Sequence, residues 1–175
     1  MKTERLYLNL ITEKDADFLN ELMNTEKWHE FIGDRGIHSK EDAIQYMEDR
    51  MDPDLNKKGF INHVMIEKET SKAVGTCSLH NREGVDGMDI GYALLPTSEG
   101  KGYASEGAKA MIKLAFTDYQ QQQISAITTD LNISSWHILQ KLGFIHKGYI
   151  QLPNSSERIR LYVLEKGDWV TIQVT

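Results

Sequence analysis

The chain of 175 residues contains a single cysteine and only three prolines. One cysteine cannot form an intramolecular disulfide, and it cannot supply the thiolate cluster of a structural zinc site. The prolines, at positions 53, 96 and 153, lie too far apart to mark a linker. We therefore expect one domain over residues 1–175, long enough to bury a core without disulfides and without a metal.

Basic residues and long apolar runs are also scarce. Lys and Arg number 20 against 26 Asp and Glu, which gives a net charge of −6. Sequence-independent binding of nucleic acid needs a basic face, so we expect no direct nucleic-acid partner. No run reaches the roughly 18 apolar residues of a membrane helix, and no signal peptide precedes Leu6, so we expect a cytoplasmic protein with no membrane partner. The acidic balance favours a cationic partner.

The residues that are present predict a mixed α+β fold. Period-two patterns indicate strands at residues 6–10, 60–67, 73–80, 88–95, 124–129, 144–151 and 158–165. Capping residues and amphipathic spacing indicate helices from residue 12 to about 24, from 39, from 100 and over 135–142. Residues 28–36 read as a helical turn or a mobile loop. The expected architecture is a central, mostly antiparallel, twisted sheet of about seven strands flanked by about four helices.

The most informative segment runs from Leu94 to Glu106, a strand end followed by a glycine-rich turn and a helix start. Gly100 and Gly102 allow close approach to a ligand, and the first-turn N–H groups form a pocket for an anion such as a pyrophosphate. The alternative is that the glycines only turn the chain. A Walker loop is excluded because Lys101 is followed by glycine, and the dinucleotide fingerprint is excluded because Ser105 stands at its third glycine.

This segment resembles motif A of the GNAT superfamily of acyl-CoA N-acyltransferases, through Leu94, Pro96, Gly100, Gly102 and Ala104. Its run Gly-Lys-Gly-Tyr-Ala-Ser-Glu is similar to the RimJ/RimL branch, which includes ribosomal-protein N-acetyltransferases. A second block, from Asn132 to Phe144, resembles the other signature of the superfamily. The similarity spans the whole sequence and is weakest between about residues 33 and 58.

The resemblance implies a GNAT fold and an N-acetyltransferase that uses acetyl-CoA as its acyl donor. The implied acceptor is a primary amine, either a protein N-terminus or a small molecule, which attacks the thioester directly in a ternary complex. Members of this family also form homodimers, and a homodimer stays open for this chain. The implied cofactor contacts come from Leu94, Gly100, Lys101, Gly102, Tyr103, Ala104, Ser105 and Asn132.

Two positions depart from the family pattern. The usual proton donor to the departing thiolate is a tyrosine where this chain has Leu139, so the resemblance implies that Ser135 takes this role. Glu99 stands where an arginine, a glutamine or an aromatic residue is usual. A carboxylate beside a pyrophosphate is unfavourable unless it points away.

The base that accepts the proton of the amine has several candidates. Asp89 is the first choice because it lies on the strand beside the expected thioester, on the same face as Gly91. The alternative for a strand carboxylate is a structural hydrogen-bond role. His80, at the end of the preceding strand, acts through a water in a second scheme, and Glu157 in the last hairpin is a third candidate.

Two other functions fit the sequence. One is a CoA-binding protein that has lost catalysis, for which Glu99 and Leu139 argue. The other is an interaction module that uses the acidic surface and binds no cofactor. Binding of acetyl-CoA and release of its thiol distinguish the three functions.

Overall fold

The computed structural model describes residues 1–51, 61–153 and 155–174. Within these residues a seven-stranded sheet has the order β1-β2-β3-β4-β5-β7-β6. The strands are β1 (Leu6–Leu10), β2 (Ile61–Glu67), β3 (Ala73–His80), β4 (Met88–Leu94), β5 (Gln123–Thr128), β6 (Ile145–Gln151) and β7 (Arg158–Glu165). All neighbouring strands are antiparallel except β4 and β5, which are parallel. The predicted strands and the mostly antiparallel sheet are confirmed; Phe60 lies outside the described residues.

The described residues contain more helices than the four expected. They are α1 (Ala16–Met23), α2 (Glu26–Phe31), α3 (Lys40–Arg50), α5 (Tyr103–Thr117), α6 (Ile133–Lys141) and α7 (Lys166–Val174), with single 3₁₀ turns at η1 (Glu13–Asp15) and η2 (Pro96–Ser98). The additional helices are α2 and α7. The sequence hides α7 because Gly167 and the β-branched Val170 disfavour a helix. Trp169 anchors it through packing against Phe116 of α5, with ring centroids 6.4 Å apart.

Both predicted N-terminal caps of the first half are confirmed. The Asp15 carboxylate accepts the backbone N–H of Thr12 at 2.8 Å, although the first turn is 3₁₀ and not α-helical. The Ser39 hydroxyl accepts the backbone N–H of Asp42 at 3.1 Å and starts α3. A side chain that satisfies an otherwise open first-turn amide fixes where a helix begins, which is why these two starts are readable from the sequence.

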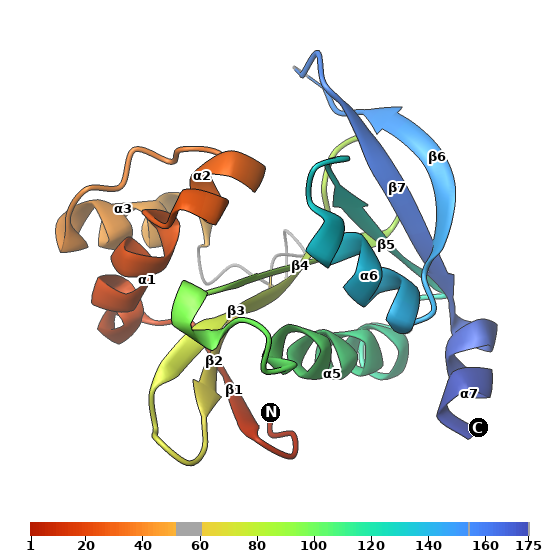
Figure 1. Cartoon of the computed structure of the whole chain (residues 1–175), viewed down its shortest axis with the longest axis horizontal. Helices are drawn as coiled ribbons and strands as arrows, with labels where there is room; N and C mark the ends of the chain where they lie inside the picture. The colour runs from red at the N-terminus through yellow and green to blue at the C-terminus, as the bar shows by residue number, and fades with distance from the viewer. Residues whose placement is uncertain (52–60, 154, 175) are drawn as a thin grey trace.

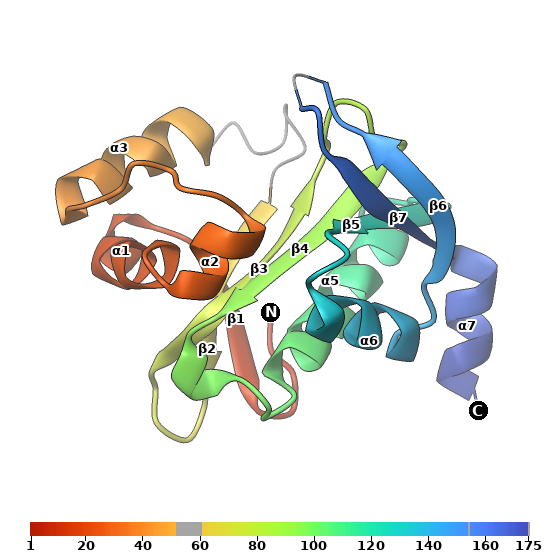
Figure 2. The ribbon, with the colours of Figure 1, turned by 45° about the horizontal axis from the view of Figure 1, so that its top comes forward.

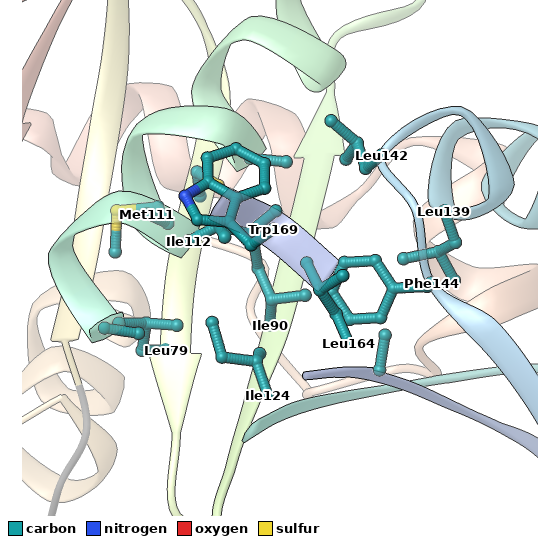
Figure 3. Packing of buried hydrophobic residues seen from close by; sticks show 14 of the residues in the cluster. Leu79, Ile90, Met111, Ile112, Ile124, Leu139, Leu142, Phe144, Leu164 and Trp169 are labelled. Carbon is teal, nitrogen blue, oxygen red and sulfur yellow. The ribbon is translucent and has the colours of Figure 1, made fainter. Parts of the chain in front are cut away.

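The helices divide between the two faces of the sheet. Figures 1 and 2 show α1, α2 and α3 grouped on one side of β3 and β4, while α5 crosses the other side. The large core lies on the α5 side and also includes residues of α6 and α7. Figure 3 shows side chains of neighbouring strands, Ile90, Ile124 and Leu164, together with Met111 and Ile112 of α5. A second, smaller core joins α1, α2 and α3.

Strand β3 shows how the sheet separates its two faces. Cys77 and Leu79 are fully buried in the α5-side core. Their neighbours Thr76, Ser78 and His80 point the other way and line a cavity. Alternate residues of a strand face opposite sides, so one strand contributes both to the core and to a polar surface.

Candidate active site

The two parallel strands at the centre of the sheet separate soon after they meet. β4 and β5 are in register at only two residue pairs in the described chain, Met88 with Ile124 and Asp89 with Ser125. β4 continues to Leu94 paired with β3, and β5 continues paired with β7. Beyond the second pair, the facing edges of β4 and β5 do not pair with each other, so their backbone N–H and C=O groups are available to a ligand.

A cavity of about 1260 Å³ extends from this opening. Its lining comes from β3, β4, β5, the turn before α5, the first turn of α6, the hairpin between β6 and β7, and α2. Segments far apart in the sequence therefore meet at one place, at the divergence of β4 and β5. Strand divergence in an open sheet is a common position for ligand sites.

The glycine-rich turn enters the cavity at the start of α5. Gly100 has φ +73°, and no described atom lies within 4 Å of the position a Cβ would take there. Gly102 has φ +83° and is the N-cap residue, so no side chain caps the amides of the first turn of α5. Positive φ at both positions explains the glycines. Uncapped amides together with the helix dipole favour an anion at this end of α5.

Glu99, the unusual residue of this turn, forms an ion pair with Lys27 of α2. The Lys27 ammonium is therefore placed against the carboxylate that would otherwise repel an anion at the turn. The same ion pair connects the helices of one face to the glycine-rich turn.

The predicted cofactor residues divide into two groups. Leu94, Gly100, Ala104 and Asn132 line the cavity. The other four, Lys101, Gly102, Tyr103 and Ser105, belong to the same turn and helix start but are not among the lining residues. The Tyr103 side chain is 5% exposed, and its hydroxyl donates to the Glu67 carboxylate of β2.

Ser135 lies at the first turn of α6, on the other side of the opening. Asn132 caps this helix: its Oδ1 accepts the Ser135 backbone N–H at 3.1 Å and the Ser134 hydroxyl at 3.0 Å. The Ser135 Oγ lies 3.1 Å from the hydroxyl of Tyr92, which extends from β4. Leu139, where the family has tyrosine, is 1% exposed and also reaches the cavity. Sequence reasoning missed Tyr92, although its position in the strand before the glycine-rich turn was a usable signal.

Asp89, the first candidate base, is 1% exposed and forms an ion pair with Arg82, with Nη2 and Oδ2 3.2 Å apart. The Arg82 Nε also lies 3.3 Å from the same oxygen. Burial raises the pKa of Asp89, while the charge and hydrogen bonds of Arg82 act in the opposite direction. The Arg82 Nε lies 3.4 Å from Oδ1 as well, so both carboxylate oxygens of Asp89 are engaged by a guanidinium that the sequence did not single out.

His80, the second candidate, pairs across the sheet with Asp89 and also lines the cavity. Its Nε2 lies 2.8 Å from the hydroxyl of Ser78, two residues earlier on the same face. Burial, and to a smaller degree Arg82, lower the pKa of His80 to about 4, so its imidazole is neutral at pH 7. A Cβ at Gly91 would lie 3.2 Å from Ser78 Oγ and 3.3 Å from His80 Nε2, so this glycine leaves space for the pair.

The third candidate base and three other residues have different surroundings. Glu157, the third candidate base, is exposed and lines the cavity from the β6–β7 hairpin. Trp28 and Phe31 of α2 line it from the opposite side. Cys77 is fully buried, and burial raises the pKa of its thiol to about 12. A thiol in this state is a packing residue and not a nucleophile.

Two features are absent from the described residues. In residues 1–51, 61–153 and 155–174, no helix has both the length and the apolar character needed to span a bilayer. Over the same ranges, no three His, Cys, Asp or Glu side chains gather in a way that suits a metal ion.

Known proteins resemble this chain in sequence and in fold. Residues 5–145 match the family model "Acetyltransferase (GNAT) domain". The uncharacterized N-acetyltransferase p20 of Bacillus licheniformis is 30% identical over 154 residues, which cover 85% of this chain and 84% of that protein.

Two solved structures share the fold at lower identity. The ribosomal-protein-S5-alanine acetyltransferase of Vibrio fischeri superimposes with a TM-score of 0.76 at 21% identity, over 97% of each chain. The spermidine N-acetyltransferase of Vibrio cholerae, solved with CoA and spermine, superimposes with a TM-score of 0.77 at 13% identity, over 95% of this chain and 98% of that one. The match to the family model covers most of the sequence and both blocks around the opening between β4 and β5. The chain belongs to the GNAT family of acetyl-CoA-dependent N-acetyltransferases.

Proposed function

We propose that this N-acetyltransferase moves the acetyl group of acetyl-CoA to a primary amine by direct attack within a ternary complex. The observation that carries the proposal is the single cavity that joins the glycine-rich turn, the opened edge of β4 and the Ser135 hydroxyl. Its volume of about 1260 Å³ exceeds the roughly 300–1,000 Å³ of common ligand sites, in keeping with two substrates bound together.

On the donor side, acetyl-CoA supplies a thioester whose carbonyl carbon accepts the amine. The uncapped amides at the start of α5 bind its pyrophosphate, with Lys101 adding a positive charge at the exposed turn. Unpaired N–H groups on the opened edge of β4 stabilise the oxyanion of the tetrahedral intermediate. Asn132 positions Ser135, and Ser135 donates a hydrogen bond to the departing sulfur.

On the acceptor side, we assign the proton-accepting role to His80 acting through Ser78. The imidazole is neutral at pH 7, and the Ser78 hydroxyl connects Nε2 to the cavity surface. Asp89 was the first choice from the sequence, but Arg82 engages its carboxylate. We therefore propose that Asp89 positions Arg82 through their ion pair. Glu157 is the remaining alternative base.

The acceptor class stays broader than a single compound. One of the structural neighbours is named for an alanine of ribosomal protein S5 and the other for spermidine. The cavity lining includes the exposed carboxylates of Glu83 and Glu157 and also the exposed guanidinium groups of Arg35 and Arg50, so its charge does not select one kind of amine. We propose a primary amine of either kind, a protein N-terminus as in the RimJ/RimL branch or a small polyamine.

The test is release of the CoA thiol from acetyl-CoA with a panel of amines: peptides with N-terminal Ser or Ala, polyamines, amino sugars and amino acids. Turnover that depends on the amine, together with mass-spectrometric detection of the N-acetyl product, is the expected result. Calorimetric binding of acetyl-CoA without turnover on any amine would instead indicate a CoA-binding protein that has lost catalysis. Absence of acetyl-CoA binding would favour the interaction module.

A further inference from the structure

The hydroxyl of Tyr92 meets Ser135 across the opening between β4 and α6. Its oxygen lies 3.1 Å from Ser135 Oγ and 3.2 Å from the backbone carbonyl oxygen of the same residue. Both residues line the cavity, so the pair forms part of its wall. No other side chain reaches Ser135 Oγ by a hydrogen bond in the described residues.

Tyr92 is held firmly enough to direct this contact. It pairs with Cys77 in the β3–β4 ladder, and its partly buried ring packs against the large core. Burial raises the pKa of the Tyr92 phenol, and the hydrogen bond to Ser135 only partly offsets this. The phenol therefore keeps its proton over the whole range in which an acetyltransferase works, and it is available as a donor.

Ser135 is fixed equally well from its own side. Asn132 holds its backbone N–H. The next residue, Trp136, has the Arg160 guanidinium 4.6 Å from its ring centroid, and Arg160 is in turn paired with Asp130. The first turn of α6 is thus attached to β7, which keeps the backbone of Ser135 next to Tyr92.

The Tyr92 hydroxyl has one hydrogen and two oxygens within reach. When it donates to the carbonyl oxygen, the Ser135 hydroxyl can donate back to Tyr92 and is then occupied. When it donates to Ser135 Oγ, the hydroxyl hydrogen of Ser135 can point into the cavity and donate a hydrogen bond there. A negative charge next to Ser135 favours the second arrangement, because hydrogen bonds in a chain polarise one another.

We propose that Tyr92 is a positioning residue for the leaving sulfur, donating to Ser135 Oγ so that Ser135 donates to the thiolate. This inference rests on the proposed function, because it assigns a role to a residue of the same acyl-transfer site. It also explains how a serine, which is a weak acid, can stabilise the departing sulfur in a chain where Leu139 provides no hydroxyl.

The chemistry balances without a proton leaving Tyr92. The ammonium form of the acceptor first gives one proton to the base, and its nitrogen then bonds to the carbonyl carbon. The C–S bond breaks with its electron pair on sulfur, where the Tyr92–Ser135 chain stabilises the charge. The nitrogen loses a second proton, and the thiolate takes up one proton from solvent, so one proton is released overall.

The kinetic test compares Tyr92→Phe, Ser135→Ala and the double variant of the full chain, with acetyl-CoA varied at saturating amine. We expect Tyr92→Phe to lower kcat about tenfold, less than the roughly 10²–10³-fold loss for removal of a direct oxyanion donor. The KM for acetyl-CoA should stay within about twofold, since only the leaving group is affected. In the Ser135→Ala background, Tyr92→Phe should have no further effect, because its action passes through Ser135. Tyr119→Phe, a partly buried tyrosine outside the cavity, is the matched control and should retain wild-type kcat.

A binding test needs no turnover. CoA carries a free thiol whose ordinary pKa is near 8.5, as for cysteine. If the chain stabilises the thiolate, wild-type affinity for CoA should increase from pH 7 to pH 10 more than affinity for desulfo-CoA does. Tyr92→Phe should reduce this difference, and calorimetry measures it directly.

The outcomes distinguish the role of Tyr92 from the proposed acetyl transfer. Wild-type kcat in Tyr92→Phe, an equal loss in the Ser135→Ala background, or an unchanged pH effect on CoA affinity would each overturn the role of Tyr92. Absence of turnover with every amine, while the CoA thiol effect depends on Tyr92, would overturn only the proposed acetyl transfer. Absence of CoA binding would overturn both.

Discussion

The two faces of β3 and β4 make opposite use of the same strands. On the α5 side, Cys77 and Leu79 are fully buried in the large core. On the other side, Ser78 and His80 line the cavity, beside the buried ion pair of Asp89. Of two residues adjacent in the sequence of β3, one thus packs in the core and the other lines the cavity.

Substitutions on the two faces should have different effects. The α5 side is close-packed, so removal of atoms leaves a void and lowers stability. The cavity side has unoccupied volume beside Ser78 and His80, so loss of a polar atom there should change activity more than stability. Neighbouring substitutions on one strand can therefore separate the two effects.

The largest effect is expected from Leu79→Ala on the α5 side. Leu79 is fully buried, and truncation of a buried leucine costs about 2–5 kcal/mol of unfolding free energy. Urea unfolding followed by circular dichroism measures the loss. Ser78→Ala, its neighbour on the cavity side, is the control and should cost less, about 0.5–1.5 kcal/mol, the net value of one hydrogen bond. Equal losses from both variants would contradict the division between the faces.

His80→Gln on the cavity side should act mainly on catalysis. Loss of a general base lowers kcat about 100-fold or more, equivalent to about 2.7 kcal/mol of barrier. The measurement is kcat under saturation with both substrates, together with the melting temperature. Asp89→Asn is the comparison variant: a larger loss in Asp89→Asn than in His80→Gln would return the base to Asp89.

The buried His63 of β2 allows the apolar α5 side to be tested through the pH dependence of stability. It is 5% exposed, its Nδ1 has no partner among the described residues, and burial lowers its pKa to about 4. Because the folded pKa lies below the unfolded value near 6.5, the unfolded chain binds more protons between these values. Stability is therefore full above pH 6.5 and falls as the pH decreases toward 4. From pH 7.5 to pH 5 this histidine should contribute a loss of about 2 kcal/mol.

His63→Leu removes this contribution and should make the pH dependence of unfolding shallower by that amount. Urea unfolding of both proteins at several pH values provides the measurement. Parallel stability profiles for the wild type and His63→Leu would show that His63 titrates normally in the folded state.

The smallest effect is expected at the rim of the cavity. The Lys27–Glu99 ion pair is partly exposed, and such pairs contribute about 0–1 kcal/mol. Glu99→Gln should leave stability nearly unchanged and tighten acetyl-CoA binding by less than about fivefold, because a carboxylate beside the glycine-rich turn is removed. Lys27→Gln should weaken binding, since Glu99 is then unpaired. Calorimetry measures the affinity of both variants for acetyl-CoA. A change in the same direction in both variants would contradict this explanation.

The fold was largely predictable because its signals are local. The alternation in β1, the caps at Thr12 and Ser39, and the glycine-rich turn before α5 each determine a structure within a few residues. α7 was not predictable, because it depends on the packing of Trp169 against Phe116, which lies far away in the sequence.

The candidate site was predictable only where a motif carries it. Gly100 and Asn132 lie in motifs, and both reach the cavity. Tyr92 and Arg82 were missed because their importance arises from contacts across the fold, with Ser135 in one case and Asp89 in the other. A single sequence shows which residues alternate on a strand, but it does not show which hydroxyl or guanidinium lies opposite.

The most direct test of the proposed reaction is kcat for thiol release by Ser135→Ala, at saturating acetyl-CoA and amine, with the affinity for acetyl-CoA measured in parallel. We predict that kcat falls about 10- to 100-fold, because the departing sulfur loses its hydrogen-bond donor, while the Kd for acetyl-CoA changes by less than about threefold. A kcat equal to that of the wild type would contradict the role of Ser135 as the hydrogen-bond donor to the departing sulfur at the opening between β4 and β5.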